Sequence, residues 1–421
     1  MSLWAFRFLL WYICIMFVQP QNRFLFLYPF RIANLCILTA AALHVLSCLQ
    51  ERRPLIRFGP ATIMALLLLM SGLISLYVGT YQTSTAWNSY IDNLAKGVVA
   101  LILVEAMATS VERVWAIQAT MMISTLWWIK AGLRLSLGGA TYAGDRVMGA
   151  AVSMVENPNG FAYMLCVFLP VYLFFYQQVP QKYIKAFFLA ITLSAVYIVF
   201  ETGSRTGLVS LILLGVFLIP KYGRHHIKTL ALIGVAVFFL LSAVGELNIQ
   251  RFRSIPDSIR SFLSGEIKES SQLSQDEESA QARRLKNRDT WALIKDHPLF
   301  GVGVSADESK YADRYPHAAG QVHNELLMAG RQMGIIGMGL YVAMLLIIFT
   351  RGRDVQRMSV EWWPALSDLG WTYKMQTLVF VVGGAFSPLP WIPPQMLIVG
   401  SVSALWLNAR QFEDEMAKRI P

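Results

Sequence analysis

Arginine side chains gather on one predicted helix within the polar stretch 246–322, which interrupts an otherwise apolar chain. The segment 283–295 reads as a helix, and Arg284, Arg288 and Trp291 follow one another at spacings of four and three residues. This spacing puts them on one helix face. Two guanidinium groups one turn apart suit a diphosphate, because each can bind phosphate oxygens through two hydrogen bonds. The alternative is a basic helix that lies on anionic lipid headgroups, with Trp291 as its anchor.

A histidine stands at the start of the next predicted helix. His323 and Asn324 precede an apolar run. Imidazole has an ordinary pKa of about 6.5, which suits proton transfer near neutral pH. Histidines at helix starts are often caps or packed polar residues, but the predicted membrane boundary and the nearby arginines favour a catalytic base here. His317 is a rival in a Pro- and Gly-containing stretch, whereas His297 precedes a proline and is interpreted as structural.

A short turn between two predicted spans supplies a further arginine. In Glu201–Gly207 the glycines allow a tight reversal, and Ser204 or Thr206 could cap the following helix. Arg205 then lies beside a helix N-terminus, a combination that favours an anion. The alternative is an arginine bound to lipid phosphate at the membrane surface. Arg146, in a polar outward loop earlier in the chain, could add another donor to an anion site.

Metal, disulfide and proton-path chemistry find little support in the sequence. No carboxylate or histidine spacing resembles a metal site, so we expect neither a metal nor another cofactor. The four cysteines all fall inside apolar runs and are interpreted as inert packing residues. Glu105 lies deep in a predicted span, but one carboxylate is weak evidence for a proton path.

Membrane helices must position these residues. The 421 residues are 55% hydrophobic and 15% charged, whereas a soluble protein usually carries roughly 25% charge. Runs of about 20 apolar residues span a bilayer. Twelve candidates lie near 3–19, 30–49, 61–81, 93–110, 114–133, 160–177, 186–202, 207–220, 229–245, 333–350, 369–386 and 394–409. We therefore expect an all-α polytopic membrane protein with about 12 transmembrane helices.

The distribution of Lys and Arg predicts the orientation of these spans. Alternate loops hold most of the basic residues, among them Arg52, Arg113, Lys182 and Arg351, and the positive-inside bias places those loops in the cytoplasm. An even number of spans then leaves both termini cytoplasmic, and the polar insert faces outside. This placement explains the net charge of +10 without nucleic acid as a partner. The chain divides into spans one to nine (1–245), a large outward loop (246–332), and the last three spans with a cytoplasmic tail (333–421).

Three motifs occur in order along the second half of the chain. They are Ser204–Gly207, the segment from Arg288 through Trp291 to Gly303, and His323–Asn324. With the size, the twelve predicted spans and the large outward loop, they resemble the O-antigen ligase and polymerase superfamily of bacterial inner membranes. The resemblance covers most of the chain. It implies a GT-C-type glycosyltransferase fold with one large periplasmic loop that contains helices.

The resemblance also implies an activity at the periplasmic face. The donor would be an O-antigen polysaccharide on undecaprenyl diphosphate, and the acceptor a sugar hydroxyl of lipid A–core, as in lipopolysaccharide biosynthesis. By motif match, His323, Arg288 and Arg205 would be catalytic. Membrane lipids are the remaining expected partners.

A metal-independent, inverting reaction is the mechanistic hypothesis. Neutral His323 would take the proton of the acceptor hydroxyl, while Arg205 and Arg288 hold the departing diphosphate. The residues expected to contact the diphosphate or glycan are Arg284, Arg146, Trp291 and Asn324. Alternatives are an O-antigen polymerase, a protein O-oligosaccharyltransferase and, in another class, a transporter that uses the same arginines only to bind a lipid-linked anion.

Overall fold

The computed structural model describes residues 1–81, 83–139, 146–149, 155–222, 275–359, 363–386 and 391–418. The predicted ninth span, near 229–245, and the first part of the polar insert lie outside these residues. Across the described residues the regular elements are helices, which confirms the predicted all-α class.

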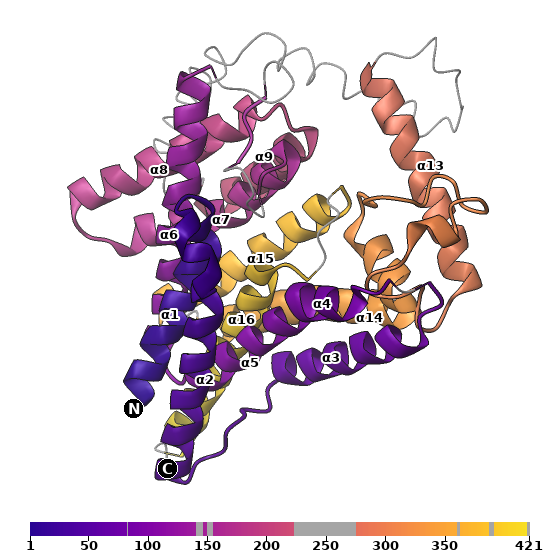
Figure 1. Cartoon of the computed structure of the whole chain (residues 1–421). Helices are drawn as coiled ribbons and strands as arrows, with labels where there is room; N and C mark the ends of the chain where they lie inside the picture. Colours follow the sequence, from indigo (N-terminus) through magenta and orange to yellow (C-terminus); the bar gives the residue numbers. More distant parts are fainter. Residues whose placement is uncertain are drawn as a thin grey trace.

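Each of the other predicted spans coincides with a helix (Figure 1). The helices are α1 (Ser2–Val18), α2 (Ile32–Glu51), α3 (Pro60–Val78), α4 (Ala86–Tyr90), α5 (Lys96–Met107), α6 (Val111–Leu137), α7 (Pro158–Gln178), α8 (Lys182–Glu201), α9 (Arg205–Tyr222), α13 (Gln275–Asp296), α14 (Glu325–Ser359), α15 (Pro364–Gly384) and α16 (Pro393–Ala417). Within the described residues, five helical segments are long and apolar enough to cross a membrane, and two shorter helices are also apolar. These helices mark a multi-pass membrane protein, while the count of twelve and the GT-C-type fold stay predictions.

Helix α7 forms the centre of the bundle. It packs against α6, α8, α9 and α15, and 78% of its most apolar window is buried. A helix that is apolar on every side needs neighbours on every side when it does not face lipid. By contrast, α2 packs chiefly on α1, is only 28% buried and exposes Leu35, Leu38 and Leu49. We interpret the exposed side of α2 as lipid-facing.

The two ends of the chain lie together. The N-terminus and the C-terminal end of α16 occupy the same end of the molecule, whereas α13 lies far from both, beside the start of α14 (Figure 1). An even number of membrane crossings leaves both chain ends on one side. The even number of spans and the cytoplasmic side of both termini stay predictions.

Glu105, the deep carboxylate singled out in the sequence, caps helix α3. Its Oε2 accepts a hydrogen bond from the backbone N–H of Thr62 at 3.0 Å. A Cβ at Gly59 would overlap the carboxylate, so glycine is what permits this close approach. The first N–H groups of a helix have no partner within the helix, and an acidic side chain can satisfy them. Glu105 therefore has a structural role, which accounts for its position without a proton path.

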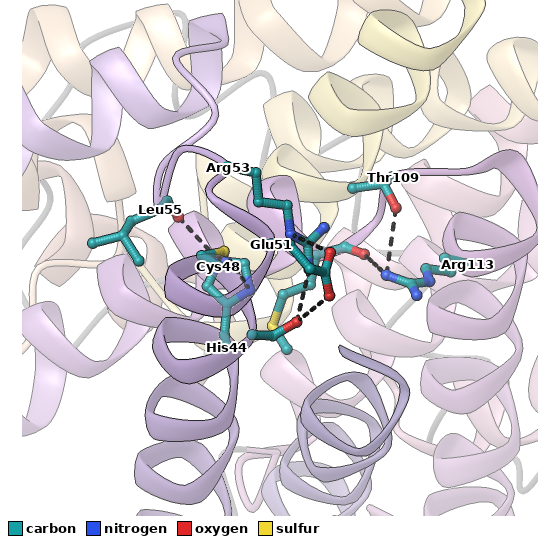
Figure 2. A network of polar contacts seen from close by, with 9 residues as sticks. His44, Cys48, Glu51, Arg53, Leu55, Thr109 and Arg113 are labelled. Carbon is teal, nitrogen blue, oxygen red and sulfur yellow. Dashed lines mark hydrogen bonds and ion pairs between the residues drawn. The ribbon is translucent and has the colours of Figure 1, made fainter. Parts of the chain in front are cut away.

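A polar network ties the end of α2 to the loop that leads into α3 (Figure 2). His44 Nε2 lies 2.9 Å from the Leu55 carbonyl oxygen. Arg53 pairs with Glu51 at 3.0 Å and donates to Ser47 Oγ at 3.1 Å. The ring of His44 is thus in contact with the backbone of this loop.

Helix α14 is broken inside its apolar run. Met333 has φ −134° and Gly334 has φ +64° with ψ −156°, so neither residue is helical. A break frees backbone groups that a continuous helix would pair, and such groups are costly at membrane depth unless the protein satisfies them. Ser75 Oγ of α3 satisfies one of them by donating to the Gln332 carbonyl at 2.6 Å.

The loop after α13 supplies the other partners at this break. The Ile335 N–H donates to the Pro298 carbonyl at 2.8 Å, and the Val302 N–H donates to the Arg331 carbonyl at 2.8 Å. Gly301 has φ +67°, and a Cβ there would stand 2.5 Å from the Arg331 carbonyl oxygen. This glycine-containing turn therefore pairs backbone groups on both sides of the break in α14.

We expect Gly334→Ala to destabilise the protein. The φ and ψ of Gly334 belong to a region that is essentially restricted to glycine, where other residues cost about 1–3 kcal/mol. A Cβ would also stand 2.4 Å from two backbone carbonyl oxygens. The variant should be purified in lower yield, and its thermal unfolding in detergent should have a lower midpoint temperature. Gly339→Ala is the matched control on the same helix, because a Cβ there meets no atom within 4 Å. Equal midpoints for the two variants would contradict this account.

Candidate functional site

The predicted basic face of helix α13 lies at the surface of the protein. The Arg288 side chain is 62% exposed and Trp291 is 45% exposed, while Arg284 is half-buried. The other face carries Thr290 and Leu293, which are buried against the rest of the protein. The helical spacing expected from the sequence is therefore confirmed, and this face is open to an anionic ligand.

His323 lies near a different pair of cations from the one the sequence suggested. Its ring is half-buried, and the charges closest to it belong to Arg283 and Lys286 of α13. Burial first, and these two charges second, lower the pKa of His323 to about 4. Both effects disfavour the imidazolium form. The ring is therefore neutral at neutral pH, which is the form that a general base requires.

Asn324 caps helix α14 and so sets where His323 stands. Its Oδ1 accepts the backbone N–H of Leu327 at 3.0 Å, and its carbonyl accepts the N–H of Met328 at 2.9 Å. An N-cap residue satisfies helix N–H groups that lack a partner in the helix. Because Oδ1 has this role, the side-chain atom of Asn324 best suited to contact a substrate is its amide Nδ2.

A second imidazole stands beside Arg288. His317 Nδ1 lies 2.8 Å from Asp289 Oδ2, and Arg288 Nε donates to Asp289 Oδ1 at 3.0 Å. The sequence offered His317 as a rival of His323 without naming a partner for it. The sequence analysis missed Asp289 because its partner His317 lies 28 residues further along the chain, so no local spacing connects the two residues.

Arg331 holds the loop between the two histidines. Its Nη1 donates to the carbonyls of Ala318 and Gly320 at 3.0 Å and 2.8 Å, and its side chain is nearly buried. Arg331 therefore fixes the backbone that leads from His317 to His323.

The turn before α9 forms a second basic cluster. Ser204 Oγ accepts the N–H of Gly207 at 3.2 Å, which confirms the predicted cap and puts Arg205 in the first turn of the helix. Arg146 donates from Nε to the Thr202 carbonyl at 2.7 Å and from Nη2 to Asn159 Oδ1 at 2.8 Å. The structure therefore joins Arg146 to the Arg205 turn and to the start of α7.

The structure separates the predicted residues into two groups. The helix neighbour of α13 is chiefly α14, whereas α9 packs on α7, α8 and α15 (Figure 1). Arg284, Arg288 and Trp291 lie on α13, and His323 and Asn324 directly precede α14. Arg205 begins α9, whereas Arg146 precedes α7 in the chain and contacts Asn159 in its first turn.

Helix α7 and a buried carboxylate link these two groups. Asn159, which binds Arg146, lies one turn before Tyr163 on α7. Gln395 of α16 donates from Nε2 to both Tyr163 and Glu325, at 3.3 Å and 2.9 Å. Glu325 directly follows Asn324, so polar contacts run from the Arg205 turn to the His323 loop.

Glu325 is a residue of this region that the sequence analysis missed. It is fully buried, and its Oε2 also accepts the hydroxyl of Tyr341 at 2.6 Å. A Cβ at Gly384 would stand 2.9 Å from this oxygen, so a glycine of α15 makes room for it. An acid at the start of an apolar run was the available signal, but its partners Tyr341 and Gln395 lie 16 and 70 residues away in the sequence.

Comparison with known proteins finds two similarities. A family model described as O-antigen ligase matches residues 160–342, which include Arg205, Arg284, Arg288, Trp291, His323 and Asn324. The chain is also 25% identical over 345 residues to the teichuronic acid biosynthesis protein TuaE of Bacillus subtilis (strain 168). That alignment covers 76% of this chain and 66% of the relative, slightly less than two thirds of the relative's length.

The matched region begins on α7, takes in the Arg205 turn and α13, and ends within α14 beyond its break. These elements carry His323 and the residues of both basic clusters except Arg146. Residues 160–342 of this chain are therefore similar to the O-antigen ligase family.

Proposed function

We propose that this protein transfers an O-antigen polysaccharide from undecaprenyl diphosphate to a sugar hydroxyl of lipid A–core at the periplasmic face of the bacterial inner membrane. The family supports a glycosyltransferase-type enzyme of polysaccharide biosynthesis. The observation that carries the proposal is a neutral imidazole, His323, beside a helix whose exposed face bears Arg288. A proton acceptor and an anion-binding group are what sugar transfer from a diphosphate requires.

In this proposal the reaction is a direct displacement at the anomeric carbon. The acceptor hydroxyl forms the new C–O bond as its proton passes to His323, and the bond from the sugar to the diphosphate breaks with inversion. Arg288 and Arg205 stabilise the charge that grows on the diphosphate, with Arg284 and Arg146 as further donors. Where bound substrate excludes water, fixed cations lower the barrier by about several kcal/mol, so they supply the charge that a divalent ion would otherwise provide.

Donor binding makes His323 a better base in this scheme. Its low pKa suits a neutral resting state, but a weak base accepts a proton reluctantly. A bound diphosphate brings negative charge toward the cationic side of α13, offsets Arg283 and Lys286, and so raises the proton affinity of the ring. Base strength therefore increases when the donor is in place.

A polymerase is the second candidate. The observation that favours it is the similarity to a protein named for teichuronic acid biosynthesis, because that name does not refer to lipid A–core. The acceptor of a polymerase would be another lipid-linked glycan. The same two clusters and the same base would serve either acceptor.

Reconstitution separates the two candidates. The purified protein in lipid vesicles should join the glycan of an undecaprenyl-diphosphate-linked donor to purified lipid A–core, as followed by gel mobility and mass spectrometry. Longer lipid-linked glycans, formed without lipid A–core, would identify the polymerase instead. Movement of the donor across the bilayer without a new glycosidic bond would establish the transporter.

Removal of His323 should abolish transfer while the protein still inserts. We expect His323→Ala to lower the rate roughly 10²–10⁴-fold, the usual contribution of a general base. The acid limb of the pH profile of kcat/KM reports the free enzyme, so its midpoint should lie near the pKa of about 4. The acid limb of the kcat profile reports the enzyme with bound donor and should lie at higher pH.

The cationic neighbour provides the control for this pH dependence. Lys286→Gln removes a positive charge near His323, so the pKa of the ring rises and the acid limb moves to higher pH. Lys310→Gln removes a cation that faces Asp307 instead, and should leave the profile in place. Full activity of His323→Ala, or no difference between the two lysine variants, would remove His323 from this role.

Arg288→Lys should impair donor use although the charge is kept. A lysine cannot offer two parallel N–H groups to a phosphate, and a hydrogen bond to a charged group is worth about 1.5–3 kcal/mol. The KM for the donor should rise roughly 10–100-fold. Arg314→Lys is the matched control, because Arg314 is exposed near the other end of the same α13–loop contact and pairs with Asp296. Equal kinetics for the two variants would argue against bidentate binding by Arg288.

A further inference from the structure

One carboxylate on α13 holds two exposed donor groups. Asp289 Oδ1 accepts Arg288 Nε at 3.0 Å, and Asp289 Oδ2 lies 2.8 Å from His317 Nδ1. The backbone N–H of His317 also donates to Oδ2, at 3.2 Å. Because the two side chains meet the two oxygens of one carboxylate, the guanidinium and the imidazole lie side by side.

Within this cluster the carboxylate is buried, and the two basic side chains are more exposed. The Asp289 side chain is 10% exposed, while those of His317 and Arg288 are 43% and 62% exposed. Nδ1 of the imidazole faces Asp289, so Nε2 is the ring nitrogen left to face outward. Arg288 likewise uses Nε for the carboxylate, which leaves the terminal Nη groups of its fork for a ligand.

The carboxylate is suited to a permanent orienting role. Burial by itself would raise the pKa of Asp289, but the hydrogen bonds from His317 and Arg288 outweigh it and hold the pKa below the ordinary value. Asp289 is therefore ionised across the neutral range. Arg331 fixes the backbone of the loop next to His317 through the Ala318 and Gly320 carbonyls, so the imidazole is held from both sides.

A contact that merely fastened the loop would look different, and the same loop contains one. Asp296 at the end of α13 pairs with Arg314 at 2.7 Å and accepts the Tyr315 hydroxyl. There the acid itself is 36% exposed, and the side chains bonded to it are an arginine and a tyrosine. At Asp289 the acid is covered and two nitrogen-bearing groups point outward, which is how an anion site is built.

We propose that Asp289 is a positioning residue that presents Arg288 and His317 together to one phosphate group of the lipid-linked diphosphate donor. This inference rests on the proposed function. It adds His317 as a ligand of the donor phosphate, separate from His323 as the base. When the donor binds, Nε2 of His317 hydrogen-bonds to a phosphate oxygen while Nδ1 stays on the Asp289 carboxylate.

The first test measures binding without transfer. The full-length protein in detergent is titrated with farnesyl diphosphate and, to isolate the diphosphate, with farnesyl monophosphate. We expect Asp289→Asn and His317→Gln each to weaken the binding of farnesyl diphosphate about tenfold, as expected for the loss of one charged hydrogen bond. Asp296→Asn is the matched control on the same helix and loop, and its affinity should stay within about twofold of the parent.

The second test asks whether the two residues act together. Because Asp289 acts through its neighbours, the double variant Asp289→Asn/His317→Gln should bind farnesyl diphosphate little worse than Asp289→Asn alone. In transfer assays both single variants should raise the KM for the donor and leave the KM for the acceptor unchanged. Asp289→Glu keeps the charge and should recover part of the loss.

The outcomes distinguish this inference from the proposed function. If the parent protein binds farnesyl diphosphate and Asp289→Asn weakens it no more than Asp296→Asn does, the inference is wrong and the proposed function stands. If His317→Gln, a change at an exposed loop position, leaves donor affinity intact, His317 is not a phosphate ligand. If the parent protein binds farnesyl diphosphate no more tightly than farnesyl monophosphate, the proposal that the donor is a diphosphate is contradicted.

Discussion

Satisfaction of the broken backbone of α14 is the constraint on which the rest of the structure depends. A membrane helix can be interrupted only where other protein groups pair its freed N–H and carbonyl groups. Here the turn after α13 supplies two of these partners. The Pro298 carbonyl accepts the N–H of Ile335, and the Val302 N–H donates to the carbonyl of Arg331. This contact anchors the polar insert to the bundle. It therefore determines where α13 and both histidines stand relative to the membrane helices.

A second constraint is the cost of buried polar groups, which the bundle meets with a connected set of contacts. Glu325 is fully buried and would be expensive without partners. Tyr341 and Gln395 provide them, and Gln395 extends the contacts to Tyr163 on α7. The same helix carries the asparagine that binds Arg146. The contacts thus fix two basic clusters from distant parts of the chain in one framework.

Electrostatics gives the two histidines different properties. His323 is half-buried next to Arg283 and Lys286, which keeps the imidazole neutral. His317 is exposed and faces a carboxylate that Arg288 shares. Identical side chains six residues apart in sequence are thereby suited to proton transfer in one case and to anion binding in the other.

The sequence by itself determined the helices, the basic face of α13, the cap at Ser204 and the prominence of His323, because each depends on local spacing and composition. It could not show that Asp289 holds His317, that Glu325 meets Gln395, or that Gly334 breaks α14 against Pro298. Each of these contacts joins residues far apart in the chain. Only the tertiary structure decided them, since the path of a loop and the position of a helix break set which distant polar atoms come within hydrogen-bond distance.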